Sequence, residues 1–189
     1  YDNDILNCYF ELSNVHGYHY SGTIIDGNRV GIWNYNDVKY YIDKDGYMNL
    51  LDTYTGKVEQ YCPFSNDKRW EYDCINGKKE GIYCIFHNNG SIMARSEMKK
   101  DEFNGKRECW YNNGTIESIE YYENDELHGK CKYWDSGGNL IKECYYEEGQ
   151  LNRLCTKWNE FGQVTSKEHY LEGIIDGLCE RILHDGSRY

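Results

Sequence analysis

The sequence predicts an all-β fold: an elongated, single-domain array of tandem antiparallel β-hairpins with a 24-residue repeat. Three observations predict this fold. The 189 residues include 20 Tyr but a single Ala, Ala94, and this composition disfavours helices and favours strands. Glycines recur every 24 residues along the second half of the chain. Asn-Gly and Asp-Gly pairs, which are typical of hairpin turns, coincide with that period.

Regular repeats occupy residues 74–189. Each turn glycine follows an aromatic or apolar residue by four positions and precedes another apolar residue by two. The turn glycines are Gly90, Gly114, Gly138, Gly162 and Gly186, with Asn66 one period earlier. The apolar residues before them are Phe86, Trp110, Trp134, Trp158 and Ile182, and those after them are Ile92, Ile116, Leu140 and Val164. Because these columns bracket the turn, we expect them to share one side of the hairpin, which only stacking on neighbouring hairpins can bury.

Two further columns keep the same period. Eight positions after the turn glycine stand Met98, Tyr122, Tyr146 and Tyr170, which we interpret as core. A second glycine series comprises Gly81, Gly105, Gly129 and Gly177, with Arg153 in the fourth place, and it is preceded by Phe103, Leu127, Leu151 and Ile175. We interpret this second series as the reversal that joins one hairpin to the next.

Residues 22–73 keep the pattern loosely and are predicted to form degenerate hairpins. Asp26-Gly27 lies before Ile32-Trp33 in the same way that Asn76-Gly77 lies before Ile82-Tyr83. Residues 1–21 are expected to form an atypical N-terminal cap, and no composition shift suggests a linker.

At these residues the chain resembles the MORN-repeat family, in the variant form found in bacterial and giant-virus proteins. The resemblance covers residues 22–189 and is best over 74–186, with 105–116, 120–129 and 129–140 as its clearest segments. It implies a solenoid of hairpins and a role as an adaptor, dimerisation or membrane-proximal module, and some bacterial variants are antitoxins. Arg153 and Asn66 in place of glycine, and the degenerate first third, depart from the family pattern.

Charge and the absence of catalytic motifs disfavour several function classes. Asp and Glu number 32 against 21 Lys and Arg, a formal net charge of −11, which disfavours nucleic acid and anionic membrane surfaces as partners. Contact with a membrane stays the less favoured alternative. No phosphate-binding glycine loop, nucleophile elbow or zinc-protease motif is present, so we expect no enzyme and no cofactor.

Cysteines and histidines offer little chemistry. Nine cysteines without a CxxC pair predict reduced thiols in an intracellular, cytoplasmic protein. Cys131, Cys155 and Cys179 share one column, where successive members lie about 9.6 Å apart, beyond the ~7 Å limit for a disulfide. Two other pairs are placed to meet across strands: Cys62 with Cys74, and Cys84 with Cys109. The histidines show no ligand spacing, so we expect no metal.

Acidic and aromatic residues are the candidates for binding. Glu143, Glu147 and Glu148 crowd one hairpin, and we interpret such clusters as a solvated face or a docking face for a basic partner, with no evident pocket. If the Tyr122 column is core, its strand neighbours point outward. The predicted partner-binding residues are Tyr111, Tyr121, Tyr133, Tyr145, His169, Glu117 and Glu143. The alternative is aromatic pairing that only stiffens the sheet.

The sequence therefore predicts a non-enzymatic protein–protein interaction or scaffold module with an extended acidic, Tyr-rich face. Its partner is another protein or a second copy of the chain bound end to end. Two alternatives stay open: an antitoxin or immunity-type protein that binds a toxic enzyme, and a targeting or regulatory array within a larger protein.

Overall fold

The computed structural model describes residues 8–13, 19–25, 28–35, 38–42, 48–62 and 67–182. It comprises two compact units, Tyr1–Ser91 with Met98–Asp101, and Ile92–Glu97 with Glu102–Tyr189. Among the described residues, every element is a strand except one 3-10 turn, Leu51–Thr53, and no helix is long or apolar enough to cross a membrane. The predicted all-β array of antiparallel hairpins is confirmed. Asn66, Gly186 and much of the expected cap lie outside the described residues.

The first unit contains a five-stranded antiparallel sheet, in the order β1-β2-β3-β4-β5, and the antiparallel strands β6, β7 and β8. Its strands are β1 (Cys8–Ser13), β2 (His19–Ile25), β3 (Asn28–Tyr35), β4 (Val38–Ile42), β5 (Met48–Leu50), β6 (Gly56–Tyr61), β7 (Lys68–Ile75) and β8 (Lys78–Phe86). A buried cluster joins these parts of the unit: Tyr41, Leu51, Val58, Tyr72 and Cys74.

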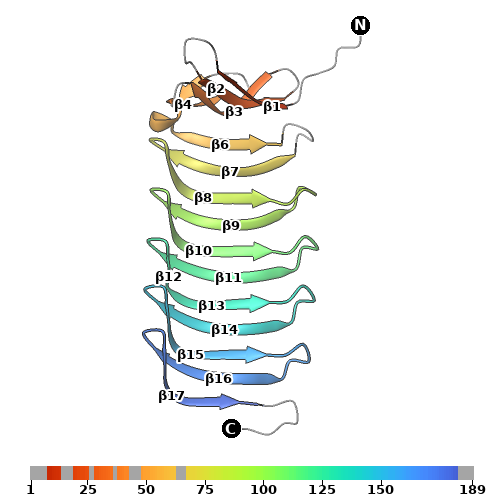
Figure 1. Ribbon diagram of the computed structural model, residues 1–189, viewed down its shortest axis with the longest axis vertical. Coiled ribbons are helices and arrows are strands. Elements are labelled where there is room, and N and C mark those ends of the chain that lie inside the picture. The colour runs from red at the N-terminus through yellow and green to blue at the C-terminus, as the bar shows by residue number, and fades with distance from the viewer. Residues whose placement is uncertain are drawn as a thin grey trace. The chain divides into compact units, whose positions relative to one another are not determined.

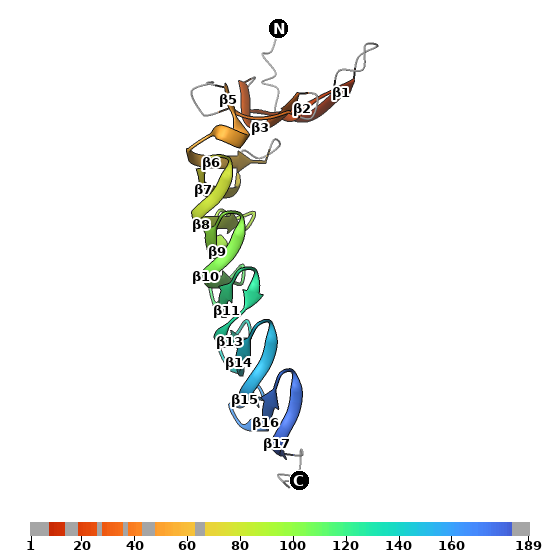
Figure 2. The ribbon, with the colours of Figure 1, turned by 90° about the vertical axis from the view of Figure 1, so that its left-hand side faces the viewer.

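The second unit is a run of hairpins whose strands follow one another in chain order (Figure 1). Figure 2 views the same hairpins after a 90° turn, and their strands are curved rather than flat. Strand β9 (Ile92–Lys99) contributes residues 92–97 to this unit. The other strands are β10 (Glu102–Trp110), β11 (Ile116–Glu123), β12 (Glu126–Leu127), β13 (Gly129–Trp134), β14 (Leu140–Glu147), β15 (Gln150–Trp158), β16 (Val164–Leu171) and β17 (Ile174–Arg181).

Wide turns close the described hairpins at Gly90, Gly114, Gly138 and Gly162. The Tyr111 N–H donates to the Thr115 carbonyl at 2.9 Å and the Gly114 N–H donates to the Tyr111 carbonyl at 2.9 Å, which encloses a three-residue loop. Only the glycine has a positive φ, 83° at Gly114, and the preceding Asn113 does not. Asn113 acts through its side chain instead, because its Oδ1 accepts the Thr115 N–H at 3.0 Å.

The apolar columns on either side of these turns pair across the hairpin, as predicted. The opposed residues are Trp110 with Ile116, Trp134 with Leu140, and Trp158 with Val164. The column that was expected to form the core is buried at two positions, Met98 and Tyr146. Its other two members, Tyr122 and Tyr170, are half-buried.

Tight two-residue turns, not the second glycine series, join successive hairpins. These turns are Asn76-Gly77, Lys100-Asp101, Asn124-Asp125, Glu148-Gly149 and Glu172-Gly173, and every residue in them has a positive φ. Gly105, Gly177 and Arg153 lie inside strands and Gly129 is the first residue of β13, so the interpretation of this series as the reversal is wrong. Between Asn152 and Thr156 the strand bulges against Cys144, and Arg153 takes a φ of 63° there. The second series thus reports a repeated β-bulge, which needs the same backbone freedom as a turn.

The expectation of reduced thiols is wrong at one place. Cys144 on β14 and Cys155 on β15 form a disulfide, with Cα atoms 4.2 Å apart. The 24-residue column does not show this pair, because its members lie two strands apart, whereas Cys144 is on the strand between Cys131 and Cys155. Neither of the two pairs that were placed to meet across strands, Cys62 with Cys74 and Cys84 with Cys109, is joined by a disulfide.

Candidate interaction surface

The sheet of the second unit has two faces that differ in chemistry. We call the face that carries Tyr121, Tyr145 and His169 the outer face, and the face that carries Tyr122, Tyr146 and Tyr170 the inner face. Adjacent strand residues point to opposite faces, so each Tyr-Tyr or His-Tyr pair is divided between them. The cross-strand partners of the outer column are Lys106, Lys130 and Leu154, respectively.

Three of the predicted site residues lie in one column on the outer face. Tyr121 is 41% exposed and His169 is exposed, whereas Tyr145 is half-buried. The guanidinium of Arg153 lies over the Tyr145 ring, 4.1 Å from its centroid, which is a cation–π contact. This column combines accessible aromatic surface with positive charge.

Tyr133 lies on the inner face, away from that column. It is opposite Lys142, whose Nζ lies 5.1 Å from the centre of the Tyr133 ring, and it packs against the cluster of Cys131, Cys144 and Tyr146. Burial raises the pKa of Tyr133 far above its usual value, and the charge of Glu120 adds to the rise. Tyr133 is therefore a supporting residue of the core.

Tyr111 belongs to the wide-turn edge. Its hydroxyl donates to the Trp134 carbonyl at 2.9 Å and so links two successive hairpins. Burial, followed by the charge of Glu117, raises the pKa of Tyr111. The structure thus brings Tyr121, Tyr145 and His169 together and leaves Tyr111 and Tyr133 elsewhere.

The two predicted carboxylates, Glu117 and Glu143, differ in whether neighbouring lysines neutralise their charge. Glu117 is exposed on β11. Glu143 is half-buried and accepts from Lys130 Nζ at 2.6 Å and Lys132 Nζ at 3.2 Å. Hydrogen bonds from Lys130 and then Lys132 lower the pKa of Glu143 despite its partial burial. The centre of the outer face is consequently an ion-paired surface rather than a purely acidic one.

Exposed acids gather instead along the edge formed by the tight turns. All are exposed, and we call this set the acidic edge: Glu102, Glu123, Asp125, Glu126, Glu147, Glu148, Glu172 and Asp176. The sequence does carry a signal for this edge, because Glu148-Gly149 and Glu172-Gly173 lie 24 residues apart.

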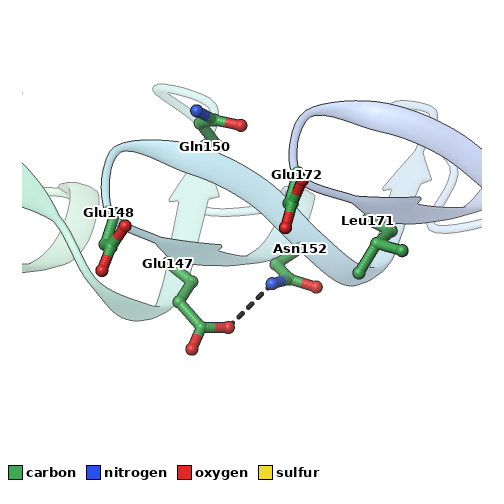
Figure 3. A pocket seen from close by; sticks show the side chains of 6 residues that line it. All are labelled: Glu147, Glu148, Gln150, Asn152, Leu171 and Glu172. Carbon is green, nitrogen blue, oxygen red and sulfur yellow. Dashed lines mark hydrogen bonds between the residues drawn. The ribbon is translucent and has the colours of Figure 1, made fainter.

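One pocket of about 410 Å³ lies at this edge, where the sequence suggested none. It lies between two successive tight turns and is lined by Glu147, Glu148, Gln150, Asn152, Leu171 and Glu172 (Figure 3). Asn152 Nδ2 donates to Glu147 Oε2 at 2.7 Å, which fixes one carboxylate at the rim. Among the described residues, no Lys, Arg or His lies within 4.0 Å of the carboxylate of Glu148 or Glu172.

Exposed apolar side chains adjoin the pocket. Leu171 is 53% exposed and Leu154 is 40% exposed, and both lie on the outer face beside His169. Ile174, opposite Leu171, is 73% exposed. Sequence reasoning missed these residues because their columns hold polar side chains in other repeats, such as Glu147 at the position equivalent to Leu171.

The site offers no metal centre within the part of the chain that the structure describes, since no group of three or more His, Cys, Asp or Glu is placed to hold an ion. The features that it does offer are an aromatic column, an apolar patch and unpaired carboxylates. Such a surface suits recognition of another molecule by many shallow contacts.

Repeated hairpins in a linear strand order, with an open side-chain face, define a β-hairpin repeat protein. Residues 103–124 and 127–148 each match the family model described as MORN repeat variant. The chain thus contains two adjacent repeats of this variant, and the resemblance to MORN repeats is confirmed. MORN repeats commonly mediate protein or membrane interactions and are generally non-enzymatic.

The other comparisons add little. A solved structure of an alternansucrase in complex with isomaltononaose is similar at 14% identity and a TM-score of 0.15, over 96% of this chain and 18% of that chain. At that score the likeness supports no inference about fold or activity. No curated protein matches the sequence.

Proposed function

We propose that the chain is a non-enzymatic interaction module that docks a basic protein segment on the outer face and acidic edge of its second unit. One observation carries the proposal. Exposed Leu171 lies in the same pocket as the carboxylates of Glu147, Glu148 and Glu172. A segment that alternates apolar and basic side chains has the matching chemistry, because its cations would meet unpaired carboxylates while its apolar groups cover the leucines.

The contrast with Glu143 supports the choice of location. That carboxylate already accepts from two lysines, so a cation arriving from a partner would have to displace them. Glu148 and Glu172 carry no such partner among the described residues, so their charge is available to attract a cation. The net charge of −11 extends this attraction beyond contact range and favours a basic protein over an anionic lipid surface.

Affinity capture with matched variants tests the proposal. Tagged wild-type protein is passed over lysate of its source cells, beside the variants Leu154→Ala/Leu171→Ala and Glu147→Gln/Glu148→Gln/Glu172→Gln. The control is Phe161→Ala, because Phe161 is 77% exposed but lies in a wide turn away from the pocket. We expect one stoichiometric, salt-sensitive protein that is retained by wild type and control and lost from both pocket variants.

Three outcomes would contradict the proposal. Equal capture by all four proteins would exclude this surface, and capture of nothing at low salt would exclude a soluble protein partner. Binding to anionic-lipid vesicles, with no protein retained, would likewise replace the basic partner with a membrane.

A further inference from the structure

Three cysteines occupy consecutive strands in the interior of the second unit. Cys131 on β13, Cys144 on β14 and Cys155 on β15 are 0%, 1% and 1% exposed. They form one buried cluster with Tyr146, and Leu127, Tyr133, Leu151 and Tyr170 pack against it. Cys144 and Cys155 are joined by a disulfide, and Cys131 is a free thiol. None of these residues belongs to the docking surface proposed above.

Strand pairing gives Cys144 two neighbours with which it can bond. Cys131 is its directly opposite residue on β13. Opposite residues of an antiparallel pair have Cα atoms about 4.5–5.5 Å apart, which is within the range that disulfides bridge. Cys155, on the other side, has its Cα 4.2 Å from that of Cys144. Cys131 and Cys155 are separated by the whole of β14, about 9.6 Å, so they cannot bond to each other without moving the backbone.

We propose that Cys131, Cys144 and Cys155 form a thiol–disulfide exchange site, in which Cys144 is bonded alternately to Cys155 and to Cys131. In the exchange, the Cys131 thiolate attacks Cys144 Sγ and a Cys131–Cys144 bond forms. The Cys144–Cys155 bond breaks, and its electron pair leaves with Cys155 Sγ, which takes up the proton that Cys131 lost. This step consumes no oxidant, because one disulfide and one thiol are present before and after it.

The two bonds constrain different parts of the repeat. The Cys144–Cys155 bond links β14 to β15, which are joined through the tight turn Glu148-Gly149. A Cys131–Cys144 bond would instead close the hairpin of β13 and β14 across its wide turn. Exchange therefore moves a covalent link from the junction between two hairpins to the interior of one hairpin. Because all three sulfurs are buried, we expect the exchange to require transient opening of these strands.

Single cysteine variants of the full chain test the site directly. Each protein is reduced, then oxidised with glutathione disulfide, which is converted to two glutathione thiols for each protein disulfide formed. Remaining thiols are alkylated, and the bonded cysteines are identified by peptide mass mapping. We expect a Cys144–Cys155 bond in wild type and in Cys131→Ser, and a Cys131–Cys144 bond in Cys155→Ser.

Cys144→Ser is the matched control, because it removes the shared partner but leaves the other two cysteines of the site, Cys131 and Cys155. We expect Cys131 and Cys155 both to be alkylated in it, with no bond between them. If a buried hydroxyl prevents folding, Cys155→Ala and Cys144→Ala replace these variants, and retention of the wild-type circular dichroism spectrum identifies folded protein.

Alkylation of the oxidised wild-type protein in mild urea then measures the exchange. Label is expected on Cys131 in most molecules and on Cys155 in the remainder, with Cys144 unlabelled. The proposal is overturned if wild type forms the Cys144–Cys155 bond but Cys155→Ser forms no Cys131–Cys144 bond. It is also overturned if Cys144→Ser forms a Cys131–Cys155 bond, or if wild type stays fully reduced.

Discussion

At the scale of single residues, Glu168 is a buried carboxylate of the second unit and is only 4% exposed. Its carboxylate accepts from the Tyr170 hydroxyl at 2.9 Å and from Arg181 at 3.0 Å, and Lys157 lies 3.8 Å away. Burial by itself would raise the pKa of Glu168, but the hydrogen bonds from Tyr170 and Arg181, with the charge of Lys157, lower it overall. The folded state therefore holds this carboxylate in its charged form.

Glu168→Gln is expected to lower the free energy of unfolding by about 1–3 kcal/mol at neutral pH, the usual cost of losing a hydrogen-bonded buried charge. Because the folded pKa lies below the unfolded value of about 4.3, this contribution is complete above that pH and is lost as pH falls through the folded pKa. Urea unfolding at neutral and acidic pH measures the difference in free energy of unfolding between wild type and Glu168→Gln. Glu160→Gln is the control, because Glu160 is exposed and lies in a turn. If the variant stayed less stable than wild type by the same amount down to the lowest pH, Glu168 would not be charged in the folded state.

How far single residues are predictable is clear from the tyrosines. Tyr121 and Tyr145 each have an adjacent core tyrosine, which sets their direction to the opposite face of the strand; Tyr121 is exposed there and Tyr145 is half-buried. Tyr133 has no such neighbour, and its direction depends on its pairing with Lys142 across a hairpin with a register shift. The sequence alone does not show where that shift falls.

At the scale of elements, the 24-residue period identified the hairpins but did not separate turns from bulges. Gly77 and Gly81 both have positive φ, 75° and 85°, yet only Gly77 lies in a turn. Glycine periodicity reports backbone conformation, and several kinds of local structure share that conformation. The strand pairing on either side is what distinguishes them.

Substitution of two turn glycines in the first unit separates backbone strain from packing. Both Gly77 and Gly90 have positive φ, so either alanine costs about 1–2 kcal/mol in strain. A Cβ at Gly77 would also lie 2.5 Å from Asp52 Cα and 2.6 Å from the Leu51 carbonyl oxygen, whereas a Cβ at Gly90 would meet nothing within 4 Å. We expect Gly77→Ala to be less stable than Gly90→Ala by at least about 1 kcal/mol, from the added overpacking. Equal losses in denaturant unfolding would show that the Leu51–Thr53 turn moves aside freely.

Arg153 permits the complementary experiment, since it occupies a position that is glycine in the other repeats. Arg153→Ala and Arg153→Gly both remove the contact with the Tyr145 ring, but only glycine relieves the φ of 63°. We expect Arg153→Gly to be the more stable variant by about 0.5–1 kcal/mol, after allowing for the flexibility of glycine in the unfolded chain. If denaturant unfolding ranks alanine above glycine, the bulge is not strained.

At the scale of the whole molecule, the fold class was predictable because one pattern repeats often enough to exclude chance. The pocket was not, because it depends on the spacing of two successive tight turns and on which residues occupy them. Leu171 and Glu172 are in the positions that Glu147 and Glu148 hold one repeat earlier. Only Leu171 departs from the repeat, and it places an apolar side chain beside the carboxylates of the pocket.

A fluorescent peptide of alternating Lys and Leu is a probe of this surface. Because long-range attraction is screened by salt, we expect its Kd to rise at least about tenfold between about 50 mM and about 500 mM NaCl. Fluorescence anisotropy measures the change, and Glu147→Gln/Glu148→Gln/Glu172→Gln should remove most of it. A peptide with Glu in place of Lys is the control and should not bind. The same salt dependence in the triple variant would show that the net charge acts without the pocket.

The wide turns have a consequence for the use of this chain as a scaffold. An added side-chain atom at Gly114 or Gly162 would meet nothing within 4 Å, so a foreign loop could replace either tip while the Trp–Ile and Trp–Val pairs below it keep their register. The two tips lie at the same edge of the second unit, four strands apart, or about 19 Å. Grafted epitopes would therefore be displayed at a spacing set by the backbone, and the repeat would serve as a molecular ruler.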